Sequence, residues 1–97
     1  MLIKAGVEIS RLNREIRRSM PKVALILWSH REVFIITSTY EGNHGVGSLH
    51  YADDAYDCKS PKENRLKCVN EIKVKLGKDY DVIDEKDHIH IEWDPKS

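Results

Sequence analysis

The stretch YDVIDEKDHIHIEW, Tyr80 to Trp93, alternates apolar and polar side chains on either side of a charged segment. The residues of Tyr80–Ile83 and of His88–Trp93 each follow the two-residue period of a β-strand. The four charged residues between them, 84–87, are typical of a turn. The stretch therefore predicts an antiparallel hairpin whose second strand directs its two histidines and its glutamate to one face.

A helix is expected immediately before this hairpin, over residues 61–76. Ser60 is suited to cap its N-terminus, Pro61 to occupy the first helical position, and Glu63 to complete a capping box. Gly77 falls where a C-terminal glycine cap is expected. The apolar stripe of this helix consists of Leu66, Val69, Ile72 and Leu76.

Helical periodicity also marks the first third of the chain. Apolar residues recur every three or four positions between Val7 and Met20, which predicts one helix over that range. Pro21 is well placed in the first turn of a second helix that runs to about His30. The residues that define the first periodic stripe are Ile9, Leu12, Ile16 and Met20.

The middle of the chain predicts a strand and a long loop. Val33–Ile36 is short, β-branched and aromatic, as strands are, and residues 37–49 contain three glycines. The order is then helices, strand, loop, strand, helix, hairpin. We therefore expect residues 1–97 to form one small α+β domain, with helices packed on a largely antiparallel sheet.

Composition excludes several classes of protein. Sixteen Lys and Arg balance sixteen Asp and Glu, which argues against a dedicated nucleic-acid binder. The longest apolar run, Val23–Trp28, is far shorter than the ~20 residues that span a bilayer. No signal-peptide pattern opens the chain, so we expect cytoplasmic synthesis without export, no membrane partner, and two free thiols at Cys58 and Cys68.

Two clusters carry side chains suited to a metal. The first, Gly47–Asp57, contains His50 and ends in an aspartate, and the second, Asp87–Trp93, contains the strand histidines. His50, Asp57 and His90 would supply two imidazoles and one carboxylate, a ligand set that suits Zn²⁺ and leaves one position open. Asp87, in the turn before the second strand, is a candidate general base.

The spacing Ser48-x-His50-x6-Asp57, followed late in the chain by His88-x-His90, resembles the zinc D-Ala-D-Ala carboxypeptidases and L-alanyl-D-glutamate endopeptidases. These enzymes include phage lysins, and their fold is shared with the Hedgehog signalling domain. The segments Glu41-Gly42-x-His44 and Ser48-Leu49-His50-Tyr51 are similar to a Hedgehog stretch. The resemblance covers roughly residues 33–94 and implies a Hedgehog/DD-peptidase-like fold.

The resemblance also implies roles for individual residues. Zinc would be bound by the ligand set named above. Asp87 occupies the position of the family's catalytic carboxylate, three residues before the last ligand, and His88 stands at the edge of the site, suited to stabilise the oxyanion. Ser48 matches the family's serine near the first ligand, and His44 would contact the substrate.

The activity implied is hydrolysis of peptide bonds in bacterial peptidoglycan stem peptides by attack of a zinc-bound water. A phage-encoded endolysin acting at the cell wall fits a short chain with no export signal. Many members anchor a substrate carboxylate with an arginine after the strand that precedes the loop. Thr39-Tyr40 stands there instead, which favours an endopeptidase over a carboxypeptidase.

Two other interpretations remain open from the sequence. A non-catalytic zinc domain of the same fold would keep the metal for structure or for partner binding. A plain α+β module with scattered histidines would bind no stoichiometric metal. Metal content separates the last of these from the other two, and turnover of peptidoglycan separates the enzyme from the non-catalytic domain.

Overall fold

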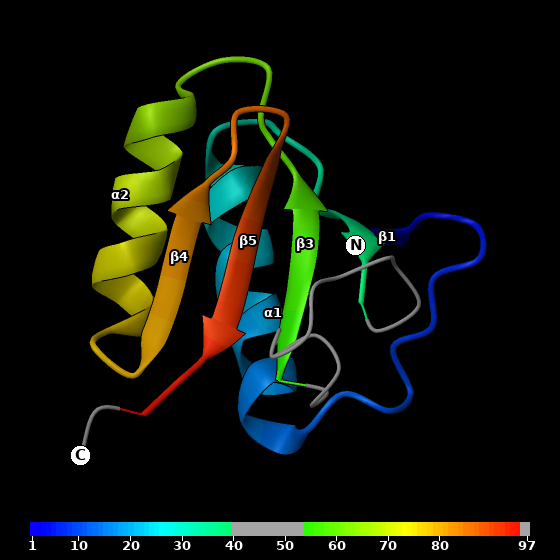
Figure 1. Ribbon diagram of the computed structural model, residues 1–97. Helices are drawn as coiled ribbons and strands as arrows, with labels where there is room; N and C mark the ends of the chain where they lie inside the picture. The colour runs from blue at the N-terminus through cyan, green and yellow to red at the C-terminus, as the bar shows by residue number, and fades with distance from the viewer. Residues whose placement is uncertain (40–53, 96–97) are drawn as a thin grey trace.

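The computed structural model describes residues 1–39 and 54–95, which form two helices on a five-stranded mixed sheet (Figure 1). The order of elements along the chain is β1 (Leu2–Ile3), α1 (Arg14–Ser29), β2 (Ile35–Ser38), β3 (Ala55–Lys59), α2 (Arg65–Leu76), β4 (Tyr80–Asp84) and β5 (His88–Trp93). This small α+β domain confirms the expected fold class.

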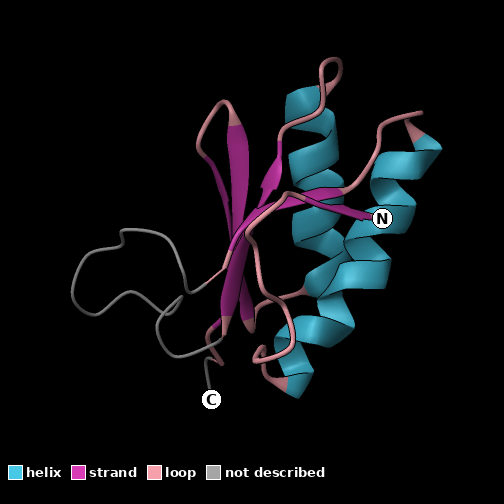
Figure 2. Ribbon diagram, turned by 90° about the vertical axis from the view of Figure 1, so that its right-hand side faces the viewer, coloured by secondary structure: helices cyan, strands magenta, loops and turns pink. Residues whose placement is uncertain are grey.

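The sheet has the strand order β1-β2-β3-β5-β4. β1 pairs with β2 in parallel, and the other three pairings are antiparallel, as expected for most of the sheet. β1 itself, only two residues long, was not expected from the sequence. Both helices lie on one face of the sheet, and Figure 2 shows this two-layer arrangement edge-on.

The hairpin at the C-terminal end forms as predicted. β5 coincides with the expected range, and β4 extends one residue further than expected, to Asp84. In the turn, Oδ1 of Asp84 accepts a hydrogen bond from the backbone N–H of Lys86 at 3.0 Å. β2, by contrast, begins two residues later than predicted, because Val33 is exposed and the chain becomes extended only at Ile35.

The sequence predicted two N-terminal helices separated at Pro21. The structure has one helix there, α1, and Pro21 lies inside it. A proline in a helix interior costs about 3 kcal/mol because it removes one backbone hydrogen bond and clashes with the preceding turn. Burial of an apolar side chain contributes about 1.5–3 kcal/mol, so a continuous stripe outweighs that cost. The stripe runs unbroken past the proline through Ile16, Met20, Val23 and Leu27.

Residues 7–12, predicted as helix, form no helix. The backbone carbonyl of Glu8 accepts a hydrogen bond from Oγ1 of the buried Thr39 at 2.7 Å, and Oε1 of Glu8 accepts one from Ser10 N–H at 2.8 Å. Leu12 still reaches the core. Tertiary contacts therefore replace the local helical hydrogen bonds here, and only the apolar positions of the prediction hold.

The start of α2 also differs from the prediction. The helix begins at Arg65, after Asn64 in the left-handed conformation with φ 57°. Ser60 does not cap it, because the helix starts further along the chain and the residue in the N-cap position is Asn64. Glycine is confirmed at the other end, where Gly77 has φ 83° and donates to the carbonyl of Lys73. Leu66, which was predicted in the apolar stripe, is exposed, and the buried residue in the first turn of the helix is Cys68.

Tyr56 on β3 is the largest side chain that is fully buried. Its hydroxyl lies 3.0 Å from Oγ of Ser19 on α1, so the buried phenol has a hydrogen-bond partner. Burial raises the pKa of Tyr56 well above its usual range. Because neighbouring side chains on a strand point to opposite faces, this contact with α1 directs Asp57 away from the helices.

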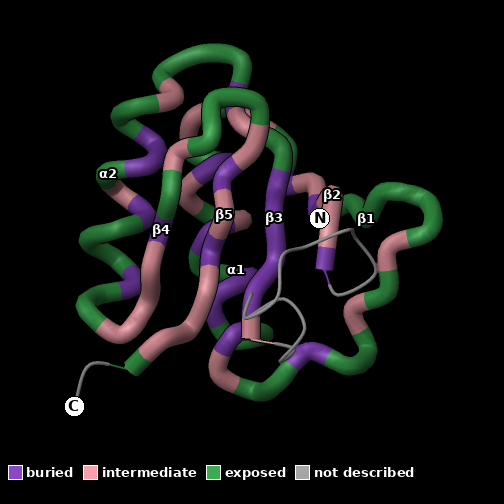
Figure 3. The backbone as a smooth tube through the Cα atoms, viewed as in Figure 1, coloured by how far each residue is buried: buried purple, intermediate pink, exposed green. Residues whose placement is uncertain are grey.

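Burial alternates along β5, as Figure 3 shows. Ile89 and Ile91 are fully buried beneath the helices, and the alternate residues His88, His90 and Glu92 are partly exposed on the other face. Within the described ranges, 1–39 and 54–95, no helix is long and apolar enough to cross a membrane.

The alternation gives a direct test of the two faces. We predict that Ile91→Ala destabilises the fold by about 2–5 kcal/mol, because it leaves a cavity under the helices. The matched control is Ile83→Ala on the neighbouring strand, where the side chain is 43% exposed, and it should cost less than about 1 kcal/mol. Urea unfolding measures both values. Equal losses in the two variants would contradict the assignment of faces.

Candidate metal centre

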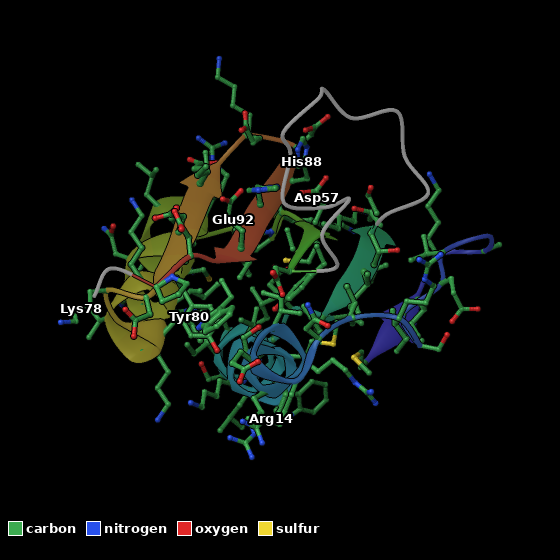
Figure 4. All side chains as sticks on the ribbon, turned by 60° about the horizontal axis from the view of Figure 1, so that its bottom comes forward. Arg14, Asp57, Lys78, Tyr80, His88 and Glu92 are labelled. Carbon is green, nitrogen blue, oxygen red and sulfur yellow. The ribbon has the colours of Figure 1, made fainter. Side chains whose placement is uncertain are left out.

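The face of the sheet opposite the helices carries a cluster of ionisable side chains. Because the period of a strand is two, β5 presents His88, His90 and Glu92 there. β3 contributes Asp57, and Figure 4 shows Asp57, His88 and Glu92 close together on the side of the sheet away from α1. We call Asp57, His88, His90 and Glu92 the sheet-face cluster.

The centre of the sheet-face cluster is one cross-strand pair. Asp57 on β3 lies directly opposite His90 on β5 in the antiparallel register. His90 donates a hydrogen bond from Nδ1 to Oδ1 of Asp57, with 2.9 Å between the two atoms. Their side chains are only 12% and 15% exposed, so little solvent screens this contact. Asp57 and His90, 33 positions apart in sequence, thus place a carboxylate oxygen and an imidazole nitrogen next to each other.

The second ring nitrogen of His90 is also engaged. Nε2 of His90 donates to Oε1 of Glu92, two residues further along the strand. A carboxylate only accepts hydrogen bonds, so a ring that donates to both carboxylates carries two protons. Burial alone would lower the pKa of His90, but the hydrogen bonds that the ring donates to Asp57 and Glu92 outweigh it, and the pKa is raised.

Asp87 and His88 form a second contact beside this pair. His88 donates from Nδ1 to Oδ1 of Asp87 at 2.6 Å, and its Nε2 lies 3.8 Å from Oδ2 of Asp57. The Asp87 side chain is 89% exposed in the turn, and that of His88 is 37% exposed. Asp87 therefore orients an imidazole whose other nitrogen faces the Asp57–His90 pair.

Four of the residues singled out in the sequence are thus close together: Asp57, Asp87, His88 and His90. The other three, His44, Ser48 and His50, lie outside the described residues. The structure therefore tests the contact between two of the expected zinc ligands and is silent about the third.

The donor set of the pair suits zinc. Zn²⁺ accepts imidazole nitrogen and carboxylate oxygen together, with bonds of about 2.0–2.2 Å. Neighbouring ligand atoms in such a tetrahedral site lie about 3.3 Å apart, which the present 2.9 Å contact reaches by a shift of about half an ångström. Asp57 and His90 therefore have the chemistry and the spacing to share one ion.

A second acidic group lies next to this pair and was missed by the sequence reasoning. Among the residues that the structure describes, Asp81, Glu92 and Asp94 offer carboxylate oxygens within 4.8 Å of one another, so this surface group could hold a metal ion. Asp81 is opposite Glu92 in the β4–β5 register. The alternation of polar residues in the hairpin already marked Asp81 and Glu92, but only the register between β4 and β5 shows that their carboxylates lie together.

The hairpin as a whole is strongly acidic. Residues 79–94 contain seven acidic side chains and one basic side chain, in a chain whose formal net charge is zero. Negative charge is therefore concentrated on the strands that bear the sheet-face cluster, which favours the approach of cations to this face.

Cys58, the neighbour of Asp57, is not a competing ligand. It is fully buried on the helix side of β3, and neither it nor Cys68 forms a disulfide. The free thiols agree with the expectation from the sequence. Burial raises the pKa of the Cys58 thiol to about 12.

We therefore predict that the Cys58 thiol does not react with an aromatic disulfide reagent at pH 8 in the native chain, because the thiolate is the reactive form. The comparison is between Cys68→Ser, which leaves only Cys58, and the same variant in denaturant, where one thiol should react within minutes. Rapid reaction of the native Cys68→Ser chain would show that Cys58 is accessible and contradict its placement.

No family model matches the chain, and no match was found among curated proteins or solved structures.

Proposed function

We propose that the chain is a zinc metallopeptidase of Hedgehog/DD-peptidase-like fold that hydrolyses peptide bonds in bacterial peptidoglycan stem peptides. The observation that carries the proposal is the Asp57–His90 pair, in which two expected ligands, distant in sequence, come within 2.9 Å of each other. The spacing of Ser48, His50 and Asp57, together with the late His88-x-His90, supports the choice of this class.

Asp57 and His90 would hold the zinc together with His50. When bound, the ion supplies a Lewis acid that polarises the scissile carbonyl and lowers the pKa of water near it. The low exposure of both side chains strengthens these electrostatic effects, because less water competes for the charges.

Two neighbouring residues would move and direct protons. Asp87 accepts a proton from the attacking water on a carboxylate oxygen while the water oxygen bonds to the carbonyl carbon. It then passes that proton to the amide nitrogen as the carbon–nitrogen bond breaks, which leaves a carboxylic acid and an amine. His88, oriented by Asp87 through Nδ1, donates from Nε2 to the carbonyl oxygen as negative charge develops there.

The substrate class rests on the resemblance. Peptidoglycan stem peptides contain D-amino acids, and an endopeptidase that cuts within them is favoured over a carboxypeptidase by Thr39-Tyr40, where many of the enzymes have an arginine. An endolysin of a phage, active at the bacterial wall, is the corresponding biological role.

The first prediction concerns metal content. The chain purified without a histidine tag should contain about one zinc, and Asp57→Ala and His90→Ala should each lose it, because each removes one ligand. His30→Ala is the matched control, since His30 pairs with Glu71 in the helical layer at 3.1 Å. Elemental analysis measures all four proteins. Zinc retained by both ligand variants would contradict the proposed centre.

The second prediction concerns turnover. Asp87→Asn should keep its zinc and hydrolyse purified peptidoglycan about 10²–10⁴-fold more slowly, because it lacks the proton acceptor. Glu85→Gln, the same chemical change in the same turn, should retain nearly full activity. The release of new amino groups measures the rate.

Two results would contradict the turnover prediction. Full activity of Asp87→Asn would refute the assigned base. A wild-type chain with bound zinc but no turnover of peptidoglycan or of a cross-linked stem peptide would instead support the non-catalytic zinc domain.

A further inference from the structure

Glu92 belongs to the sheet-face cluster but takes no part in the proposed reaction. It lies two residues after His90 on β5, so the two side chains share a face. Its register partners are Ala55 on β3 and Asp81 on β4. The side chain is 19% exposed, which is low for a glutamate on the face of the sheet that α1 and α2 do not cover.

The contact that Glu92 makes is with the ring of a proposed ligand. Oε1 of Glu92 accepts a hydrogen bond from Nε2 of His90, while Nδ1 of the same ring faces Oδ1 of Asp57. The imidazole is therefore held at both nitrogens, and its plane is fixed by groups on two adjacent strands.

The position of the ion decides which ring nitrogen of His90 binds it. A histidine ligates through a nitrogen that carries a lone pair, and the other nitrogen then carries the proton. Each ring nitrogen of His90 faces a carboxylate, so an ion shared with Asp57 replaces the proton at Nδ1, and the carboxylate of Glu92 then holds the remaining proton at Nε2. Nδ1 is the atom on the Asp57 side, so the tautomer that Glu92 selects is the one that the Asp57–His90 pair requires.

We propose that Glu92 is a positioning residue of the metal centre, which fixes the tautomer and orientation of His90 so that Nδ1 and Asp57 bind one zinc ion. The inference rests on the proposed zinc centre. Carboxylates that receive the second N–H of a ligating histidine commonly contribute about 10–100-fold to metal affinity. Glu92 thus acts through His90 and makes no contact with the reacting atoms.

The test is zinc affinity, measured by competition with a chromogenic chelator on the full chain. Glu92→Ala should bind zinc about 10–100-fold more weakly than wild type. Glu92→Gln keeps an oxygen that can accept from Nε2 and should lose less. The Co²⁺-substituted proteins add a spectroscopic readout, because a reoriented His90 changes the d–d absorption bands of the ion in Glu92→Ala.

Asp81→Asn is the matched control, since it removes one negative charge opposite Glu92 from the same acidic group. It should change the affinity by less than about threefold if the effect of Glu92 is local, because a more distant charge next to water is well screened. Urea unfolding in the presence of a chelator establishes that each variant folds without metal.

Three results would overturn the proposal: a Glu92→Ala chain that binds zinc as tightly as wild type, a Glu92→Gln chain as weak as Glu92→Ala, or an Asp81→Asn chain as weak as Glu92→Ala. Failure of the proposed function gives a different pattern. A wild-type chain without stoichiometric zinc removes both proposals, whereas zinc that depends on Asp57 but not on Glu92 removes the positioning role alone.

Discussion

The register between β3 and β5 is the constraint on which the rest of the molecule depends. It sets Asp57 opposite His90 and Cys58 opposite Ile89, so each pair lies wholly on one face of the sheet. A slip of one residue on either strand would move that strand's apolar side chains to the face opposite the helices and its ionisable ones under the helices. Burial of Ile89 and Ile91 therefore holds the Asp57–His90 pair in place.

The helical layer fixes this register from the other side. Tyr56 reaches Ser19 on α1, and the stripe of α1 continues past Pro21 to complete the cover of the sheet. With Ile89 and Ile91 on the helix side, Asp57, Asp81, His88, His90 and Glu92 share the opposite face, whereas Asp84 lies opposite Ile89 and accepts a hydrogen bond from Arg65 of α2. The carboxylates of Asp57, Asp81 and Glu92 therefore lie on one surface, which is suited to a cation.

The imidazole of His90 contacts a carboxylate at each of its two nitrogens. It lies between Asp57 and Glu92 and is 15% exposed, and these two carboxylates raise its pKa against the effect of burial. Without metal, the protonated ring is the state that satisfies both carboxylates. A divalent cation bound to Nδ1 would replace the proton there and would supply the positive charge next to Asp57. The same geometry therefore suits the metal-free chain with a protonated ring and the metal-bound chain.

The sequence was sufficient for features that depend on local pattern. The two-residue period of Tyr80–Trp93 predicted the hairpin and the face shared by His88, His90 and Glu92, and the position of Gly77 predicted the end of α2. The local rules were wrong where distant contacts compete with them. The side chain of Thr39 donates a hydrogen bond to the carbonyl of Glu8, and burial of the α1 stripe outweighs the cost of Pro21.

The candidate metal centre was likewise predictable only in part. Spacing alone identified Asp57 and His90 as candidate ligands, but their distance of 2.9 Å comes from the strand register, which the sequence does not reveal. The contacts of Asp81 with Glu92 and Asp94 depend on register and on the path of the chain after β5, so the second acidic group could not be found from pattern. His50 and its neighbours in the motif lie outside the described residues.

The most direct test of the account is a crystal structure of the zinc-loaded chain with diffraction data on both sides of the zinc absorption edge. A zinc centre at the Asp57–His90 pair should give one strong anomalous peak within bonding distance of Nδ1 of His90 and a carboxylate oxygen of Asp57, with Glu92 still on Nε2. A peak only among Asp81, Glu92 and Asp94, or none on this face of the sheet, would contradict it.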